Sequence, residues 1–352
     1  MASDIWRWIG DEKVLIDLVA SLSLPMLFLV VAAATALLLK SADSMIEGVV
    51  QLTRRTGIPS IVVGATVVSL GTTTPEMFVS VTAAWMGNPG LALGNGVGSI
   101  ICDTGLILGI TCLLVAMPAN RYILNRTGWV QVGAATLLVL IAVGSLLLAE
   151  GEPVLQRWVG FLLLTLLLGY LGMSYLWARR LGNGQSKKYD SPIMSIGRSS
   201  LLVFLGLVGV AAGSRILVPC ASEIARRLGV PEDIIAATLV ALGTSLPELI
   251  TAITAVRKGH PEITLGNIVG ADVLNCLFVI GAAAAARPLA VPGTFFTFHF
   301  PAMILILYSF RVFIFINRDG RFRRWQGGWL VAIYVAYVAL QYILSLGMHE
   351  GG

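Results

Sequence analysis

Two glutamates are the residues of this sequence best suited to bind a cation. Glu76 and Glu248 each directly follow a proline, and a hydroxyl stands four residues earlier, at Thr72 and Thr244. Residues four apart share one face of an α-helix, so we expect each hydroxyl beside its carboxylate. Carboxylate and hydroxyl oxygens are ligands of hard cations such as Ca²⁺.

The prolines predict a break in each helix. Pro75 and Pro247 have no N–H and clash with the backbone one turn earlier, which leaves the carbonyls of Gly71 and Gly243 without their helical partners. Within a membrane, such free carbonyls are tolerated only where they line a cavity or bind an ion. We therefore expect both carbonyls to add ligands to the site.

The next predicted helix in each case adds further oxygen atoms. Ser99 and Asp103 again stand four residues apart, Asn275 takes the matching place later in the chain, and Asp272 lies close to it. This set contains no soft ligand for copper or zinc and suits Ca²⁺. Asp272 could bind the ion, take a proton or cap a neighbouring helix. Four carboxylates inside a membrane would together cost roughly 10 kcal/mol or more, which favours a functional role.

The motif occurs twice. A shift of 172 residues aligns 41–109 with 213–281 without a gap, and 18 of the 46 positions from 64 to 109 are identical. The first copy reads ATVVSLGTTTPEM and LGNGVGSIICD, and the second reads ATLVALGTSLPEL and LGNIVGADVLN. General apolar similarity does not place Thr-x-x-Pro-Glu twice at one offset.

Composition indicates a membrane protein. Of the 352 residues 57% are hydrophobic and 12% are charged, and the mean hydropathy is +0.85. We predict an all-α integral membrane protein with ten transmembrane helices. These are expected near 14–39, 58–85, 91–117, 127–149, 154–178, 199–225, 233–256, 263–286, 293–316 and 326–347. The net charge of +5 is attributed to loop orientation and not to nucleic-acid binding.

A polar linker at 179–198 separates a first five-helix repeat at 1–178 from a second at 199–352. Five is an odd number, so the two halves are expected in opposite orientations, as an inverted repeat. Sixteen Lys and Arg residues lie in the loops after odd-numbered helices and six lie on the other side. This bias places both termini outside and the linker in the cytoplasm.

The two copies resemble the α-repeats of the sodium/calcium exchanger family, in the cation/calcium antiporter superfamily. The motifs G-T-[ST]-x-P-E and G-N-x-x-G, each present twice, carry the resemblance. It implies an antiporter of the cell membrane that exports Ca²⁺ in exchange for Na⁺ by alternating access, with no enzymatic activity, cofactor or obligate protein partner. By this resemblance Glu76 and Glu248 are the central ligands, assisted by Thr72, Thr73, Thr244, Ser245, Ser99, Asp103 and Asn275.

The sequence also departs from the family pattern. The family commonly has Asn in the first repeat and Asp in the second where this chain has Asp103 and Asn275, so the two residues have changed places. Ala271 cannot supply the hydroxyl expected there, and Asp272 adds a carboxylate. Ca²⁺/H⁺ exchange and K⁺ dependence therefore remain alternatives, as do a passive cation channel and an intramembrane protease that uses Asp103 and Asp272.

Overall fold

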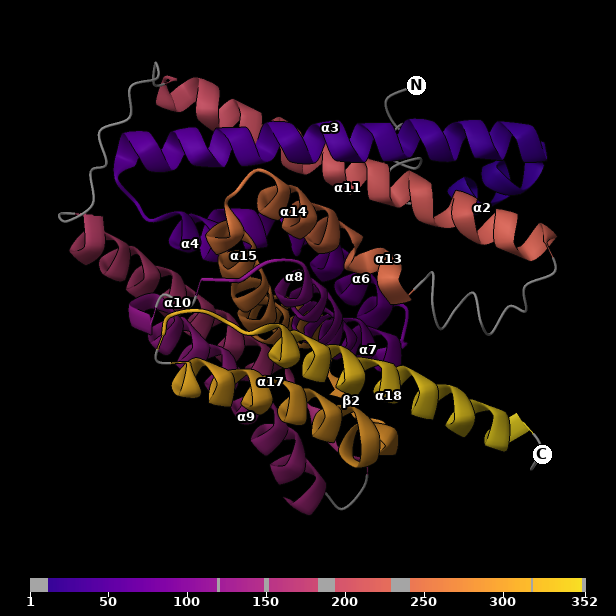
Figure 1. The fold of residues 1–352 in the computed structure, drawn as a ribbon. Helices are drawn as coiled ribbons and strands as arrows, with labels where there is room; N and C mark the ends of the chain where they lie inside the picture. The colour runs from indigo at the N-terminus through magenta and orange to yellow at the C-terminus, as the bar shows by residue number, and fades with distance from the viewer. Residues whose placement is uncertain are drawn as a thin grey trace.

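The computed structural model describes residues 12–118, 121–148, 152–182, 194–228, 241–317 and 319–349 (Figure 1). In the first half the elements are α2 (Glu12–Ser21), α3 (Leu24–Thr56), α4 (Ser60–Val63), η1 (Gly64–Val68), α5 (Ser69–Thr72), α6 (Thr74–Trp85), α7 (Pro89–Ile100), η2 (Ile101–Ile107), α8 (Leu108–Leu114), α9 (Arg121–Leu148), β1 (Val154–Leu155) and α10 (Arg157–Gly182). In the second half they are α11 (Ile196–Arg227), α13 (Ala241–Thr244), α14 (Leu246–Arg257), α15 (Pro261–Leu274), η4 (Asn275–Val279), α16 (Ile280–Ala286), β2 (Leu289–Ala290), η5 (Phe295–His299), α17 (Phe300–Ile316) and α18 (Arg324–His349). The η segments are π-helical.

The chain is an all-α membrane protein, as the sequence predicts. Within the described ranges, eight helices are long and apolar enough to span a membrane, and a ninth span forms if the bent pair 60–72 and 74–85 is counted as one. This number is consistent with the ten predicted helices, because the helix expected at 233–256 lies partly outside the described residues. Residues 183–193 of the predicted linker at 179–198 also lie outside them, whereas α10 continues to Gly182 and α11 begins at Ile196.

The first predicted helix is wrong in its bounds. Instead of one helix at 14–39, the short α2 is followed by α3, which continues to Thr56 and includes Lys40, Arg54 and Arg55, all expected in a loop. The polar segment after Lys40 stays helical because its apolar side chains pack in the core against α11. The helix ends only at Gly57, which has a φ of 70°.

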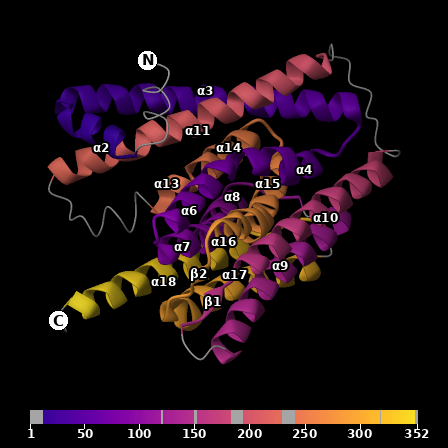
Figure 2. The ribbon, with the colours of Figure 1, turned by 180° about the vertical axis from the view of Figure 1, so that it is seen from behind.

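The two longest helices, α3 and α11, form an antiparallel pair along one face of the molecule (Figures 1 and 2). Gly48 of α3 faces Ser199 and Val203 of α11, whereas Gly206, further along α11, faces Met45, earlier in α3. Residues 24 and 196, at which these helices begin, are also 172 apart. Corresponding helices therefore run in opposite directions, as the predicted inverted repeat requires.

Connections predicted on the same side of the membrane lie together. Strands β1 and β2 pair antiparallel between the loops that precede α10 and follow α16. At the other end of the helices, the chain at Pro118 forms a bridge with Arg321, and the Phe322 N–H donates to the Met117 carbonyl at 2.9 Å. These contacts match the predicted alternation of loops.

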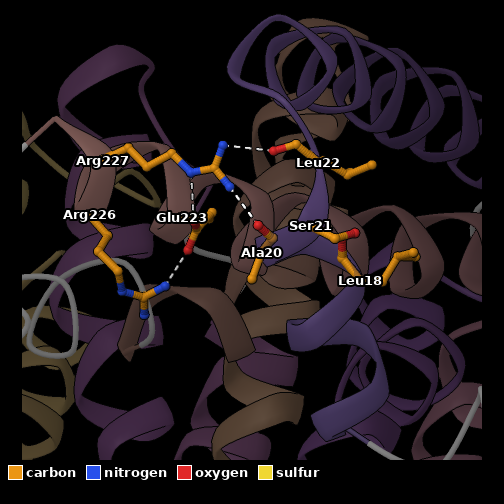
Figure 3. Close-up of polar contacts among 7 residues, drawn as sticks. All are labelled: Leu18, Ala20, Ser21, Leu22, Glu223, Arg226 and Arg227. Carbon is orange, nitrogen blue, oxygen red and sulfur yellow. Dashed lines mark hydrogen bonds and ion pairs between the residues drawn. The ribbon is translucent and has the colours of Figure 1, made fainter.

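An arginine at the end of α11 fixes the end of α2 (Figure 3). Arg227 donates hydrogen bonds to the carbonyls of Ala20 at 2.8 Å and Leu22 at 2.7 Å, and Glu223 holds both Arg227 and Arg226. The carbonyls at the end of α2 have no helical partner, so Arg227 satisfies them and favours the negative end of the helix dipole. This contact joins the start of the first half to the first helix of the second half.

The centre of the molecule depends on close backbone contact between α15 and the segment formed by α4 and η1. A Cβ added to Gly270 would lie 2.5 Å from the Ala65 carbonyl oxygen, and one added to Gly266 would lie 2.1 Å from that of Ile61. The Tyr170 hydroxyl of α10 donates to the same Ala65 carbonyl at 3.1 Å. Glycine is therefore the residue that allows the two halves to meet here.

We expect Gly270→Ala to lower the free energy of unfolding by about 1–3 kcal/mol, because the added methyl group must displace backbone. Thermal unfolding of the purified protein in detergent measures this loss. Gly169→Ala is the matched control, since a Cβ at Gly169 meets no other described atom within 4 Å. Equal melting temperatures for the two variants would contradict the close contact.

Candidate cation site

The site predicted from the sequence is built at two helix breaks. The first falls at Thr73, between α5 and α6, and the second at Ser245, between α13 and α14. Pro75 and Pro247 occupy the first turn of the helix that follows, where a missing N–H removes no helical hydrogen bond. Both predicted breaks are confirmed, and the first bends the span by 42°.

The structure brings the two glutamates together. Glu76 and Glu248 lie in the first turns of α6 and α14, each is only 1% exposed, and the charge of Glu248 acts on Glu76. The Thr73 hydroxyl, from the first break, donates to Glu248 Oε1 at 3.5 Å. A residue of one half therefore contacts the acid of the other half.

A third carboxylate belongs to the same cluster. Asp103 lies at the start of η2, is fully buried, and is subject to the charges of Glu248 and Asp272. Ser245 lies close to it, although its hydroxyl makes no hydrogen bond of acceptable geometry within the described residues. The acids expected to converge are thus within electrostatic reach of one another.

Many oxygen atoms of this cluster are buried without a partner among the described residues. Both carboxylate oxygens of Glu76 and of Asp103 have none, and neither has Glu248 Oε2. The side-chain oxygens of three other predicted ligands, Ser99, Ser245 and Asn275, also have none. Buried polar atoms are normally hydrogen-bonded. So many buried oxygen atoms without a partner in one place therefore indicate a binding site for a cation, which oxygen atoms can coordinate.

The other predicted ligands lie at the breaks, with different environments. Thr72 is buried, and its hydroxyl reaches Ser69 O at 3.3 Å and Asn267 Oδ1 at 3.4 Å, whereas Thr244 is only partly buried. Gly71 and Gly243 pack against α11: a Cβ on them would lie 2.4 Å from a Leu207 methyl and 2.8 Å from a Val218 methyl. This helix therefore covers both breaks.

Two asparagines of the repeated G-N motif also belong to the site, and the sequence analysis assigned them no role. Asn95 donates to the Glu76 carbonyl at 3.0 Å and to Ser80 Oγ at 2.9 Å, while Asn267 accepts from Thr72. Their repetition at the 172-residue offset was the signal that could have identified them.

In each half, a side-chain hydroxyl links the same pair of helices at the same pair of positions. The donor lies on the first helix in one half and on the second helix in the other. The Ser80 hydroxyl of α6 donates to the Ala92 carbonyl of α7 at 3.1 Å. In the second half the Thr264 hydroxyl of α15 donates to the Ala252 carbonyl of α14 at 2.9 Å. Each bond holds the helix with a glutamate, α6 or α14, against α7 or α15. These helices continue directly into the π-helical segments that contain Asp103 and Asn275.

Asp272 stands to one side of the mirrored set. It is 1% exposed, and its Oδ2 accepts hydrogen bonds from Thr104 of η2 and, at 2.5 Å, from Gln131 of α9. At the 172-residue offset its counterpart is Ile100. The charge of Asp272 thus acts on Asp103 of the cluster, but Asp272 has two hydrogen-bond donors, whereas Glu76 and Asp103 have none among the described residues.

The arrangement is suited to a hard cation. None of the ion pairs among the described residues involves these four carboxylates, so a cation would compensate charge that now lies buried and unpaired. In the part of the chain that is described, no three Asp, Glu, His or Cys side chains are placed to hold a metal by themselves. A cation between the glutamates would therefore take further ligands from hydroxyl, amide and main-chain oxygens, which Ca²⁺ and Na⁺ both accept.

Fold and site together define a multi-pass membrane protein in which two homologous halves of opposite orientation enclose a buried acidic centre. The family model described as "Sodium/calcium exchanger protein" matches residues 26–176 and 198–343. The chain belongs to this family, and the resemblance found in the sequence is confirmed.

Relatives and solved structures agree over nearly the whole length. Sodium/calcium exchanger MaX1 of Methanosarcina acetivorans is 28% identical over 347 residues, covering 90% of this chain and 99% of the relative. Inner membrane protein YrbG of Escherichia coli K12 is 31% identical over 316 residues, covering 88% and 94%. A structure of the sodium-calcium exchanger NCX_Mj, soaked with Na⁺ and Sr²⁺, matches with a TM-score of 0.75 at 25% identity, covering 90% and 99%.

We expect Asp103→Asn to raise the melting temperature of the cation-free protein by about 2 °C or more, because it removes one of several buried like charges. The same variant should gain less stability from added Ca²⁺ than the parent protein. Asn275→Asp, at the equivalent position, should do the opposite in the cation-free protein. A cation-free melting temperature that falls in Asp103→Asn would contradict the repulsion among these acids.

Proposed function

We propose that the protein is a secondary antiporter that exchanges Ca²⁺ for Na⁺ at the cluster of Glu76, Glu248 and Asp103. The observation that carries this proposal is the set of buried oxygen atoms without partners at two corresponding helix breaks. The names of the relatives support the choice of ions, since MaX1 and NCX_Mj are both sodium/calcium exchangers.

The proposed ligands follow the sequence expectation. Glu76 and Glu248 hold the ion from opposite halves, and Asp103 adds a third charge. The remaining ligands are Thr72, Thr73, Thr244, Ser245, Ser99, Asn275 and the carbonyls of Gly71 and Gly243. Asp272 lies next to these ligands, where its charge acts on Asp103.

Exchange follows from the requirement for charge compensation. A buried carboxylate cluster without a cation is costly, so an empty site resists closure against both aqueous phases. One Ca²⁺ or several Na⁺ ions supply the missing charge, but the same oxygens cannot serve both loads at once. Movement of the site across the membrane is thereby limited to its loaded forms, which couples the two fluxes.

Alternating access would arise from movement of α3 and α11 relative to the other helices. These two helices lie side by side along one face (Figures 1 and 2). Leu207 and Val218 of α11 fill the space beside Gly71 and Gly243. A displacement of α11 along its axis would uncover one break and cover the other, as expected for a transporter with inverted repeats.

The direction and the location are parts of the same proposal. We assign Ca²⁺ export driven by Na⁺ entry to a cell membrane, with both termini outside and the central linker cytoplasmic. H⁺-coupled or K⁺-dependent exchange is the second candidate, because Asp272 adds a buried acid that the mirrored positions lack.

We expect Glu76→Gln and Glu248→Gln each to reduce Ca²⁺ flux about 100-fold or more, equivalent to ~2.8 kcal/mol, because the neutral amide cannot balance the positive charge of the ion. The measurement is ⁴⁵Ca²⁺ uptake into proteoliposomes with Na⁺, K⁺ and H⁺ gradients imposed one at a time. Glu262→Gln is the matched control, since Glu262 lies outside the cluster beside His260. Flux close to that of the parent protein in either cluster variant would refute the assignment.

The orientation can be tested separately by labelling single added cysteines in intact cells. All four native cysteines are buried, and Glu152 and Asp319 are exposed on opposite sides of the predicted topology. We expect a membrane-impermeant maleimide to label Glu152→Cys from outside and to label Asp319→Cys only after permeabilisation. The reverse pattern would overturn the proposed orientation.

A further inference from the structure

Asp272 has a binding environment of its own, built from three helices. Its carboxylate lies on α15, Thr104 lies on η2, and Gln131 lies on α9, a helix that supplies no ligand in the proposed calcium site. Both neighbours donate to the same oxygen, Asp272 Oδ2, and Gln131 Nε2 also lies 3.5 Å from Thr104 Oγ1. The three side chains are therefore in mutual contact.

All three are almost completely buried. Thr104 is 0% exposed, and Gln131 and Asp272 are each 1% exposed. A polar amide in the apolar helix α9 is costly unless its hydrogen-bonding groups are used. Burial of three such groups at one point indicates a built site and not incidental contact.

Two oxygen atoms of this group have no partner in the described structure. They are Asp272 Oδ1 and Gln131 Oε1, and both are buried. They belong to the two groups that are hydrogen-bonded to each other, so both lie within a few ångströms of that bond. A half-turn of the Gln131 amide about its last torsion would also present its oxygen, instead of its N–H, to the Asp272 carboxylate.

We propose that Asp272, Gln131 and Thr104 form a second cation subsite that takes a monovalent ion, Na⁺, when the exchanger is loaded with Na⁺. This inference rests on the proposed function and deepens it. The subsite offers one formal negative charge and two neutral oxygens, which match a monovalent ion. A divalent ion would be left with a buried uncompensated charge, and Ca²⁺ prefers roughly 6–8 oxygen ligands.

The position of the subsite links it to the calcium site. The charge of Asp272 acts on Asp103, which in turn is close to Glu248. Na⁺ beside Asp272 would remove that repulsion and add one cation to the Na⁺ load. In the Ca²⁺ load, the donors Gln131 and Thr104 compensate Asp272 instead.

The test is the number of Na⁺ ions exchanged per Ca²⁺, measured as the membrane potential at which Ca²⁺ flux stops in proteoliposomes with a fixed Na⁺ gradient. We expect Asp272→Asn to lower this ratio by about one and to reduce the Hill coefficient for Na⁺. Gln131→Leu, which keeps the carboxylate, should raise the Na⁺ half-saturation concentration by about fivefold or more.

Thr111→Val is the matched control, because among the described residues this buried hydroxyl donates to the main-chain carbonyls of Ile107 and Leu108, one turn earlier, at 2.9 Å. An unchanged Na⁺:Ca²⁺ ratio in Asp272→Asn, or in Gln131→Leu an unchanged Na⁺ half-saturation, would overturn the subsite. If Ca²⁺ flux in Asp272→Asn no longer depends on a pH gradient while the Na⁺:Ca²⁺ ratio stays constant, Asp272 is a proton site. This result would also overturn the Na⁺ subsite. Failure of the parent protein to couple Ca²⁺ to Na⁺ would instead refute the proposed function.

Discussion

The structure depends on the burial of acidic side chains that form no ion pair with any basic residue in the described part of the chain. Glu76, Glu248, Asp103 and Asp272 are each at most 1% exposed, and each is within reach of the charge of another member of the group. Protein groups alone leave much of this charge and many oxygen atoms unsatisfied. A fold that retains such a centre inside a membrane gains from it only when cations are bound, so binding and conformational change become coupled.

The inverted repeat explains how so many oxygens reach one place. A proline that directly precedes a glutamate breaks the helix and sets the acid at the start of the next segment. Repetition of the unit in the opposite orientation points the second acid at the first. Close contact between Gly266 and Gly270 of α15 and the backbone near Ala65 then holds the halves together. With Asp103 in the first half and Asn275 at the equivalent position of the second, the central cluster contains three carboxylates.

Much of this was predictable because its causes are local. The missing N–H of Pro75 and Pro247 predicted the helix breaks before them, and the length of the apolar segments predicted most of the helices. The extent of α3 to Thr56 was not predictable in the same way, since the segment after Lys40 is stabilised by packing against α11, 150 or more residues away. The roles of Asn95 and Asn267 were missed although both recur at the repeat offset. Gln131 carries no sequence signal beyond being an amide in an apolar helix, and its contact with Asp272 depends on how α9 and α15 pack together.

The most direct test of the central claim is equilibrium binding of ⁴⁵Ca²⁺ to the purified protein as the Na⁺ concentration is raised. We predict one Ca²⁺ bound per chain at the Glu76 and Glu248 cluster, displaced by Na⁺ with a Hill coefficient above one. Ca²⁺ binding that is indifferent to Na⁺, or that persists when both glutamates are replaced by glutamine, would contradict the account.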